Sequence, residues 1–247
     1  MVRSSWRIYI GLILVGMSIA LGLVHIAVFR NPKDLFFYLT LDIVFVPIQV
    51  LLVTLIIEKL LAEREKQTML NKLNMVIGAF FGEAGNDLLK AMLVFSADFS
   101  SLSERFRISP QWAEQEYLAA KKFTAAGDFS FAPGPAQLKS LRNLLLAKRE
   151  FLLALLENPN LLEHEAFTDL LWAVFHLTEE LEARGDFETL PETDLQHLEK
   201  DISRAFSFLI REWLAYLRHL REAYPYIYSL ELRTNPFNPE ASPIVKS

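Results

Sequence analysis

The sequence predicts an all-α protein: a two-helix transmembrane hairpin that continues through a helical stalk into an antiparallel cytoplasmic helical bundle with an extended C-terminal tail. Two apolar runs near the N-terminus are each long enough to span a membrane, and apolar residues in the remaining chain recur with helical spacing. No run alternates convincingly as a β-strand before the tail. We therefore expect four parts: a hairpin (1–57), a stalk and juxtamembrane helix (58–85), a helical bundle (86–224) and a Pro-rich tail (225–247).

The composition excludes several classes of protein. The chain has 247 residues, a formal net charge of −5 and no cysteine. Lysine and arginine are scattered among acidic residues, so there is no basic stripe for nucleic acid, which we exclude as a partner. The absence of cysteine excludes disulfides, thiolate catalysis and cysteine-based zinc or iron–sulfur sites. The hydrophobic fraction of 52% is high, and the hairpin accounts for much of the excess.

The two apolar runs cover residues 8–29 and 35–57, with a short polar turn between them. A helix rises about 1.5 Å per residue, so about 20 residues cross a hydrocarbon core of about 30 Å. Small residues from Ser18 to Ala20 resemble a signal-peptide cleavage site, but the apolar run continues past them to Phe29. We therefore expect an uncleaved membrane anchor.

Positive charges flank the terminal sides of the hairpin. Arg3 and Arg7 precede the first run and further lysines and arginines follow the second, whereas the turn holds only Arg30 and Lys33. Positively charged flanks tend to remain in the cytoplasm. We expect both termini to be cytoplasmic and the protein to be integral to the cytoplasmic (inner) membrane.

Small residues in the first run stand at the spacing that permits close helix contact. Gly16 and Ala20 form one small-xxx-small pair, and Ser18 and Gly22 form another. Helix packing is one use of these pairs. The alternative is that glycine is simply common in membrane helices.

Polar residues interrupt the second run at Asp42 and Gln49. An ionisable group inside a span costs at least ~2.5 kcal/mol, so it normally faces protein or water. Asp42 is expected to be protonated, hydrogen-bonded to a neighbouring helix or near the headgroups; the alternative is a pore or proton relay. Pro47 predicts a kink, because it removes a backbone hydrogen bond.

Residues 58–66 continue the helical pattern with mixed charge and without glycine or proline, so we expect one long helix that leaves the membrane as a stalk. An apolar stripe from Leu70 to Phe80 then needs a packing partner. Gly78 and Gly82 are a further small-xxx-small pair. They permit close helix contact, or they mark a break and turn near the second glycine.

Capping and turn residues divide the next part of the chain into helices. The last of these carries an apolar stripe over about eight turns, which is typical of a core helix. We expect an antiparallel bundle with short loops. Its expected helices cover 86–99, 110–126, 136–157, 163–184 and 191–224.

Two histidines stand at helical spacing from carboxylates, as in carboxylate-bridged metal bundles. Such bundles need two Glu-x-x-His units and two further inward glutamates, whereas here one unit is inverted and the other uses aspartate. We therefore expect solvated helix faces, with no metal site and no cofactor. Motifs of serine hydrolases and zinc proteases are also absent, so we predict no catalytic residue. The histidine groups are His176 with Glu179 and Glu180, and His197 with Asp194 and Asp201.

The tail differs from the rest of the chain because its apolar residues alternate and prolines recur. We expect residues 224–237 to dock as an extended segment along helices of the same bundle or of a neighbouring subunit. The alternatives are addition to a sheet edge of a protein partner, and disorder. The candidate docking residues are Tyr226, Tyr228, Leu230, Leu232 and Phe237.

Short motifs in residues 72–81, 224–228 and 232–237 resemble a family of bacterial membrane proteins with two N-terminal spans and a helical cytoplasmic region. Members of that family are uncharacterised. The resemblance therefore implies the hairpin and the cytoplasmic domain, and no activity, cofactor or site.

The functional hypothesis that follows is a non-enzymatic, membrane-anchored helical module that acts as a sensor or scaffold. Its expected partners are membrane lipid, further copies in a homo-oligomer and a protein that binds the tail. The alternative is a subunit of an oligomeric channel or transporter with Asp42 and Gln49 facing the pore, because two spans are too few to enclose one. A metalloenzyme built on the histidine and carboxylate faces is a weaker third hypothesis.

Overall fold

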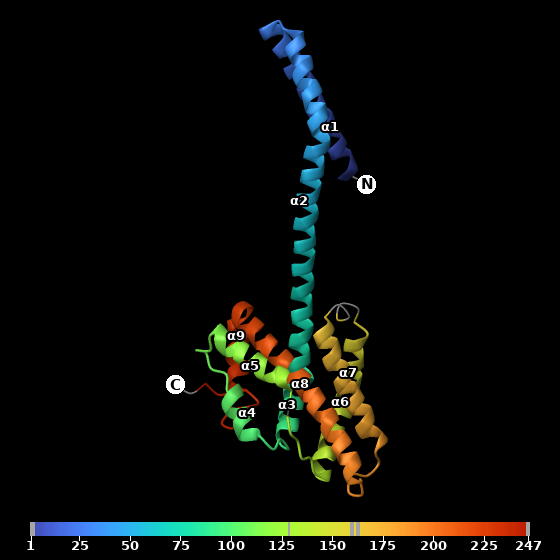
Figure 1. Cartoon of the computed structure of the whole chain (residues 1–247), viewed down its shortest axis with the longest axis vertical. Coiled ribbons are helices and arrows are strands. Elements are labelled where there is room, and N and C mark those ends of the chain that lie inside the picture. Colours follow the sequence, from blue (N-terminus) through green and yellow to red (C-terminus); the bar gives the residue numbers. More distant parts are fainter. Residues whose placement is uncertain (1–2, 128, 159–160, 162–163, 246–247) are drawn as a thin grey trace. The chain divides into compact units, whose positions relative to one another are not determined.

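The structure is a computed structural model that describes residues 3–127, 129–158, 161 and 164–245 (Figure 1). The protein is all-α, and the described residues contain no β-strand beyond one isolated antiparallel bridge between Ser96 and Phe131. The chain divides into two compact units, Met1–Lys66 and Gln67–Ser247, called here the N-terminal and C-terminal units.

Two apolar helices form the N-terminal unit: α1 (Arg3–Phe29) and the first part of α2 (Pro32–Phe80). The Asn31 side chain accepts a hydrogen bond from the Lys33 backbone N–H and donates one to the Asp34 carboxylate, at 3.2 and 2.7 Å. Mean hydropathy reaches 2.5 in α1 and 2.4 in α2. By length and composition both helices are able to cross a membrane.

Helix α2 is continuous from Pro32 to Phe80 and passes through Pro47 and the charged segment 58–66. Its continuity follows from the absence of glycine and proline between residues 48 and 77. Only the last turns of α2 contribute buried residues, at Leu73, Ile77 and Phe80.

A π-helical turn, η1 (Phe81–Gly85), joins α2 to α3 (Asn86–Leu93). The break and turn considered for this segment do not occur, since helical backbone continues through Gly82. Gly85 permits close packing here, because a Cβ atom on it would lie 2.5 Å from Phe81 Cδ1 and 2.8 Å from Phe80 Cε1. Both rings are fully buried.

The helices that follow agree with the expected ranges apart from their ends and one addition. The helix expected over 86–99 ends at Leu93, and α4 (Phe99–Phe106) is an additional short helix. The next helix starts at Glu114, because the Ala113 backbone N–H donates to the Glu116 carboxylate at 2.8 Å. The described helices of this part are α5 (Glu114–Ala126), α6 (Pro135–Leu156), α7 (Glu165–Ala183) and α8 (Glu192–Ala223).

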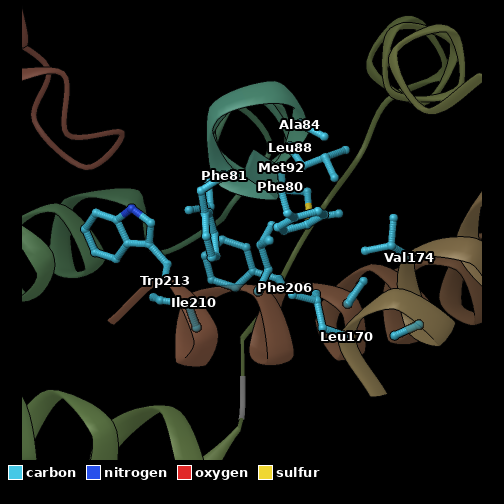
Figure 2. Close-up of a cluster of buried hydrophobic side chains, with 14 of the residues drawn as sticks. Phe80, Phe81, Ala84, Leu88, Met92, Leu170, Val174, Phe206, Ile210 and Trp213 are labelled. Carbon is cyan, nitrogen blue, oxygen red and sulfur yellow. The ribbon is translucent and has the colours of Figure 1, made fainter. Parts of the chain in front are cut away.

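Helix α8 is at the centre of the C-terminal unit and contacts α3, α5, α7 and α9, while α6 packs on α3 and α7 (Figure 1). Figure 2 shows side chains of η1, α3, α7 and α8 meeting in the core. Phe81 stacks on Tyr216 of α8 with ring centroids 5.1 Å apart, and Phe80 meets Phe167 of α7 edge-on at 5.3 Å. Buried apolar residues of α8 include Leu198, Ile202, Ala205, Phe206, Leu209, Trp213, Leu217 and Leu220.

The expectation of an extended segment after residue 224 is wrong for its first part, which forms α9 (Pro225–Arg233). Pro225 occupies the first helical turn, where its missing N–H has no cost. Tyr228 and Glu231 face inward at helical spacing, and the Tyr228 hydroxyl lies 2.9 Å from the Tyr117 hydroxyl of α5. The period-two alternation of the sequence therefore does not describe the buried face.

Residues after α9 fold back onto the helices. Phe237 is fully buried, and its backbone carbonyl accepts a 2.6 Å hydrogen bond from the Ser103 hydroxyl. The Asn235 amide donates to the Phe106 carbonyl at 2.9 Å. Of the other candidate docking residues, Leu232 is half-buried, and Tyr226 and Leu230 are exposed.

Candidate functional site

Two histidine–carboxylate pairs face each other across the contact between α7 and α8. His176 and Glu180 are one turn apart on α7, and His197 and Asp201 are one turn apart on α8. Residues four apart on a helix project from the same face. Because α7 and α8 pack against each other, the two faces form one polar cluster, defined here as His176, Glu180, His197 and Asp201.

The imidazole and carboxylate atoms of this cluster are within 4 Å of one another in four pairs. His176 Nε2 lies 3.5 Å from Asp201 Oδ2 and 3.8 Å from Glu180 Oε1. His197 Nε2 lies 3.3 Å from Asp201 Oδ2 and 3.5 Å from Glu180 Oε2. Potential ligand atoms of His176, Glu180 and Asp201 all lie within 4.8 Å of one another.

Asp201 is at the base of the cluster. Only 2% of its side chain is exposed, whereas the two imidazoles are about half exposed, at 45% and 50%. Asp201 Oδ2 is buried and makes no hydrogen bond of acceptable geometry, although both imidazole nitrogens are near it. Their distances of 3.3 and 3.5 Å exceed the usual 2.7 to 3.2 Å of an N–H···O bond.

Arginines hold the outer oxygens of both carboxylates. Arg184 donates a hydrogen bond to Glu180 Oε2 at 2.6 Å. It also forms a bidentate hydrogen-bonded pair with the Asp194 carboxylate, with both bonds 2.7 Å long. Arg204 lies 3.2 Å from Asp201 Oδ1. The hydrogen bond from Arg184 lowers the pKa of Glu180, and the imidazoles of His176 and His197 contribute in the same direction. Glu180 is therefore a carboxylate at neutral pH.

This cluster was not predicted from the sequence. The two histidine faces were expected to be separate and solvated, which is wrong for Asp201, because its side chain is buried. Asp194 contributes to the site only indirectly, through Arg184, and Glu179 is exposed outside the cluster. A usable signal was present: both helices carry a histidine and a carboxylate four residues apart. The register between α7 and α8 was the missing information.

Other candidate residues belong to the N-terminal unit. Asp42 and Gln49 are exposed on α2, and no atom lies within 4 Å of a Cβ built on Gly16 or Gly22. Ser18 and Ala20 are likewise exposed on α1. Their roles in a pore or in helix packing stay predictions.

The two glycines of the second pair, Gly78 and Gly82, have different surroundings. A Cβ on Gly78 would make ordinary van der Waals contact with Tyr216 Cε2 at 3.5 Å, so the ring of this α8 residue packs on α2 there. A Cβ on Gly82 would meet nothing within 4 Å. Only Gly78 therefore lies against another helix, and that contact is with a side chain.

The fold is that of an all-α protein with two apolar N-terminal helices and a helical C-terminal unit. The chain belongs to the family of uncharacterised protein MJ1433: residues 2–61 match the family's N-terminal helical domain and residues 69–233 match its C-terminal helical domain. The division between the two units falls between the matched ranges.

The chain is 45% identical over 235 residues to uncharacterised protein MJ1433 of Methanocaldococcus jannaschii, a match that covers 95% of this chain and 94% of the relative. No solved structure matches. The resemblance to an uncharacterised family with helical N- and C-terminal parts is confirmed. The relative is archaeal, so the expected bacterial origin of the family has no support.

Proposed function

We propose that the protein is a non-enzymatic, membrane-anchored helical module that acts as a sensor or scaffold. The observation that carries this proposal is the composition of α2. One uninterrupted helix holds an apolar segment of spanning length and, from Leu73 onward, residues buried in the core of the C-terminal unit. A helix of this kind is suited to connect a membrane with a folded domain.

The apolar surface of the N-terminal unit supports an anchor in lipid. None of the residues in its two most apolar stretches is buried within the chain. Soluble monomers rarely expose contiguous apolar patches larger than a few hundred Å². Insertion into a bilayer, with the positively charged flanks in the cytoplasm, removes this surface from water. Both termini are then cytoplasmic.

The end of α2 supports a role in transmission. Phe80 and Phe81, at the junction with η1, are fully buried and contact aromatic rings of α7 and α8. Packed cores respond to small helix shifts by changing between discrete arrangements. A displacement of α2 would therefore change the packing of Phe80 and Phe81 against α7 and α8.

Extraction of membranes from cells that produce the full chain tests the anchor. The proposal expects the protein to remain in the membrane pellet at alkaline pH and to be released by detergent. Release by alkaline carbonate alone would overturn the anchored module. Native mass spectrometry of the detergent-solubilised chain then measures the number of copies, for which the proposal expects a homo-oligomer.

A second candidate is a subunit of an oligomeric channel. Asp42 and Gln49 are seven residues apart, which is nearly two helical turns, and therefore share one face of α2. In an oligomer this polar face would be turned toward other copies or toward water. The separate ion-flux experiment described in the Discussion distinguishes this candidate from the module.

A further inference from the structure

We propose that His176, Glu180, His197 and Asp201 bind one divalent first-row transition-metal ion between α7 and α8. This inference goes beyond the anchored module and does not depend on it, because all four residues belong to the C-terminal unit. It reverses the expectation of two solvated faces without a metal site.

Three of the side chains, His176, Glu180 and Asp201, are close enough to share one ion, and His197 lies beside two of them. Nitrogen and oxygen ligands bind Zn²⁺ at about 2.0 to 2.2 Å, which places two tetrahedral ligands about 3.3 to 3.6 Å apart. One potential ligand atom each of His176, Glu180 and Asp201 lies within 4.8 Å of the others, and His176 Nε2 is 3.5 Å from Asp201 Oδ2. His197 Nε2 is 3.3 Å from Asp201 Oδ2 and 3.5 Å from Glu180 Oε2, whereas the 3.8 Å contact of His176 is with Glu180 Oε1. Binding of one ion by all four side chains would therefore require rearrangement of Glu180 and His197.

The buried oxygen of Asp201 is an independent reason to expect a ligand. A buried carboxylate oxygen without a hydrogen bond is costly, since it has lost its water and has gained no partner. Asp201 Oδ2 is in this state, and it faces both imidazole nitrogens. A cation bound by Oδ2 and the two nitrogens would supply the missing partner.

The arginines leave one oxygen of each carboxylate facing the histidines. Arg184 engages Glu180 Oε2, which is also 3.5 Å from His197, and leaves Oε1 near His176. Arg204 engages Asp201 Oδ1, so Oδ2 is turned toward both imidazoles. Metal-binding carboxylates are commonly oriented by such outer hydrogen bonds. The two arginines also limit the net negative charge of the cluster.

The ligand types select the class of metal. Ca²⁺ and Mg²⁺ take oxygen ligands, whereas imidazole nitrogen suits Zn²⁺, Fe²⁺, Ni²⁺ and Cu²⁺. Because the imidazoles are half exposed, the ion would be accessible to solvent and able to exchange. The geometry points to a reversible site for an ion of this class, with Zn²⁺ and its spectroscopic substitute Co²⁺ as the probes.

Titration of the metal-stripped full chain in detergent, without a histidine tag, tests the site. We expect one Zn²⁺ per chain by isothermal titration calorimetry and a visible Co²⁺ absorption spectrum of tetrahedral type. His176→Asn and His197→Asn should each lower the affinity about tenfold or more. Excess Mg²⁺ should not compete.

Glu179→Gln is the matched control for Glu180→Gln. Both substitutions remove one negative charge from the same turn of α7, but only Glu180 belongs to the cluster. Glu180→Gln should weaken binding and Glu179→Gln should leave it unchanged.

The two histidines are half exposed, so their variants should fold, and circular dichroism checks this. Absence of Zn²⁺ and Co²⁺ binding by the native chain, or native affinity in the double histidine variant, would overturn the proposal.

Discussion

The ring of Phe237, four residues beyond the end of α9, lies 5.1 Å from the ring of Trp213 in α8. Phe237 is also 5.1 Å from the ring of Phe106 in α4, and it is fully buried. The last part of the described chain thus completes the core of the C-terminal unit.

Phe237→Ala should destabilise the C-terminal unit by about 3 to 5 kcal/mol, because it removes a buried aromatic ring and leaves a cavity between Phe106 and Trp213. Denaturant unfolding of the full chain in detergent, followed by tryptophan fluorescence, measures this. Tyr226→Ala is the control, since 73% of Tyr226 is exposed, and it should have little effect. Equal losses in both variants would contradict the inferred role of Phe237.

Gly85→Ala should destabilise the protein by about 1 to 3 kcal/mol, because the added methyl group would overlap the buried rings of Phe80 and Phe81. Gly82→Ala, in the same π-helical turn, places its methyl group in open space and should be neutral or stabilising by up to about 1 kcal/mol. The same unfolding measurement compares the two. A tolerated Gly85→Ala would show that the core near η1 is loosely packed.

Helix positions could be predicted from sequence because their signals are local. Pro135 at the start of α6 and the apolar stripe of α8 belong to this kind. Helix α9 could not be predicted in this way, because its apolar residues alternate as in a β-strand. The contact of Tyr228 with Tyr117, which lies on the buried side of α9, involves a helix that is distant in sequence.

Prediction of the polar cluster from the sequence likewise required long-range information. The spacing of His176 to Glu180 and of His197 to Asp201 is readable in the sequence, but the burial of Asp201 is not. It follows from the packing of α8 on α7, which sets the meeting point of the two helix faces. The arginine contacts with Glu180 and Asp201 are local, at i,i+4 and i,i+3 spacing.

Glu231 should make the stability of the C-terminal unit depend on pH. Burial raises the pKa of this carboxyl, although the hydrogen bond from Asn86 and the nearby Lys90 oppose the shift. A raised pKa in the folded state means that ionisation favours unfolding, so this group's stabilising effect declines as the pH rises from the ordinary glutamate value through the raised one.

Glu231→Gln keeps an acceptor for Asn86 and removes the charge. The variant should be more stable than the native chain at pH 8, and the difference should shrink as the pH approaches about 4.3, the ordinary glutamate value. Unfolding at several pH values measures this, with exposed Glu179→Gln as the control. A difference that is constant over this pH range would contradict the assignment.

Asp42→Asn distinguishes the module from the channel, because it removes the charge from α2 and keeps the shape of the side chain. The module predicts no ion flux in liposomes that contain either the native chain or the variant. Flux through the native chain that is abolished by Asp42→Asn would favour the channel instead.

The central claim is that α1 and α2 cross a membrane and leave both termini in the cytoplasm. Single cysteines at positions 5, 31 and 247 of this cysteine-free chain test it, as Ser5→Cys, Asn31→Cys and Ser247→Cys. In intact cells a membrane-impermeant maleimide should label only Asn31→Cys, and after permeabilisation it should label all three. Labelling of Ser247→Cys in intact cells would contradict the claim.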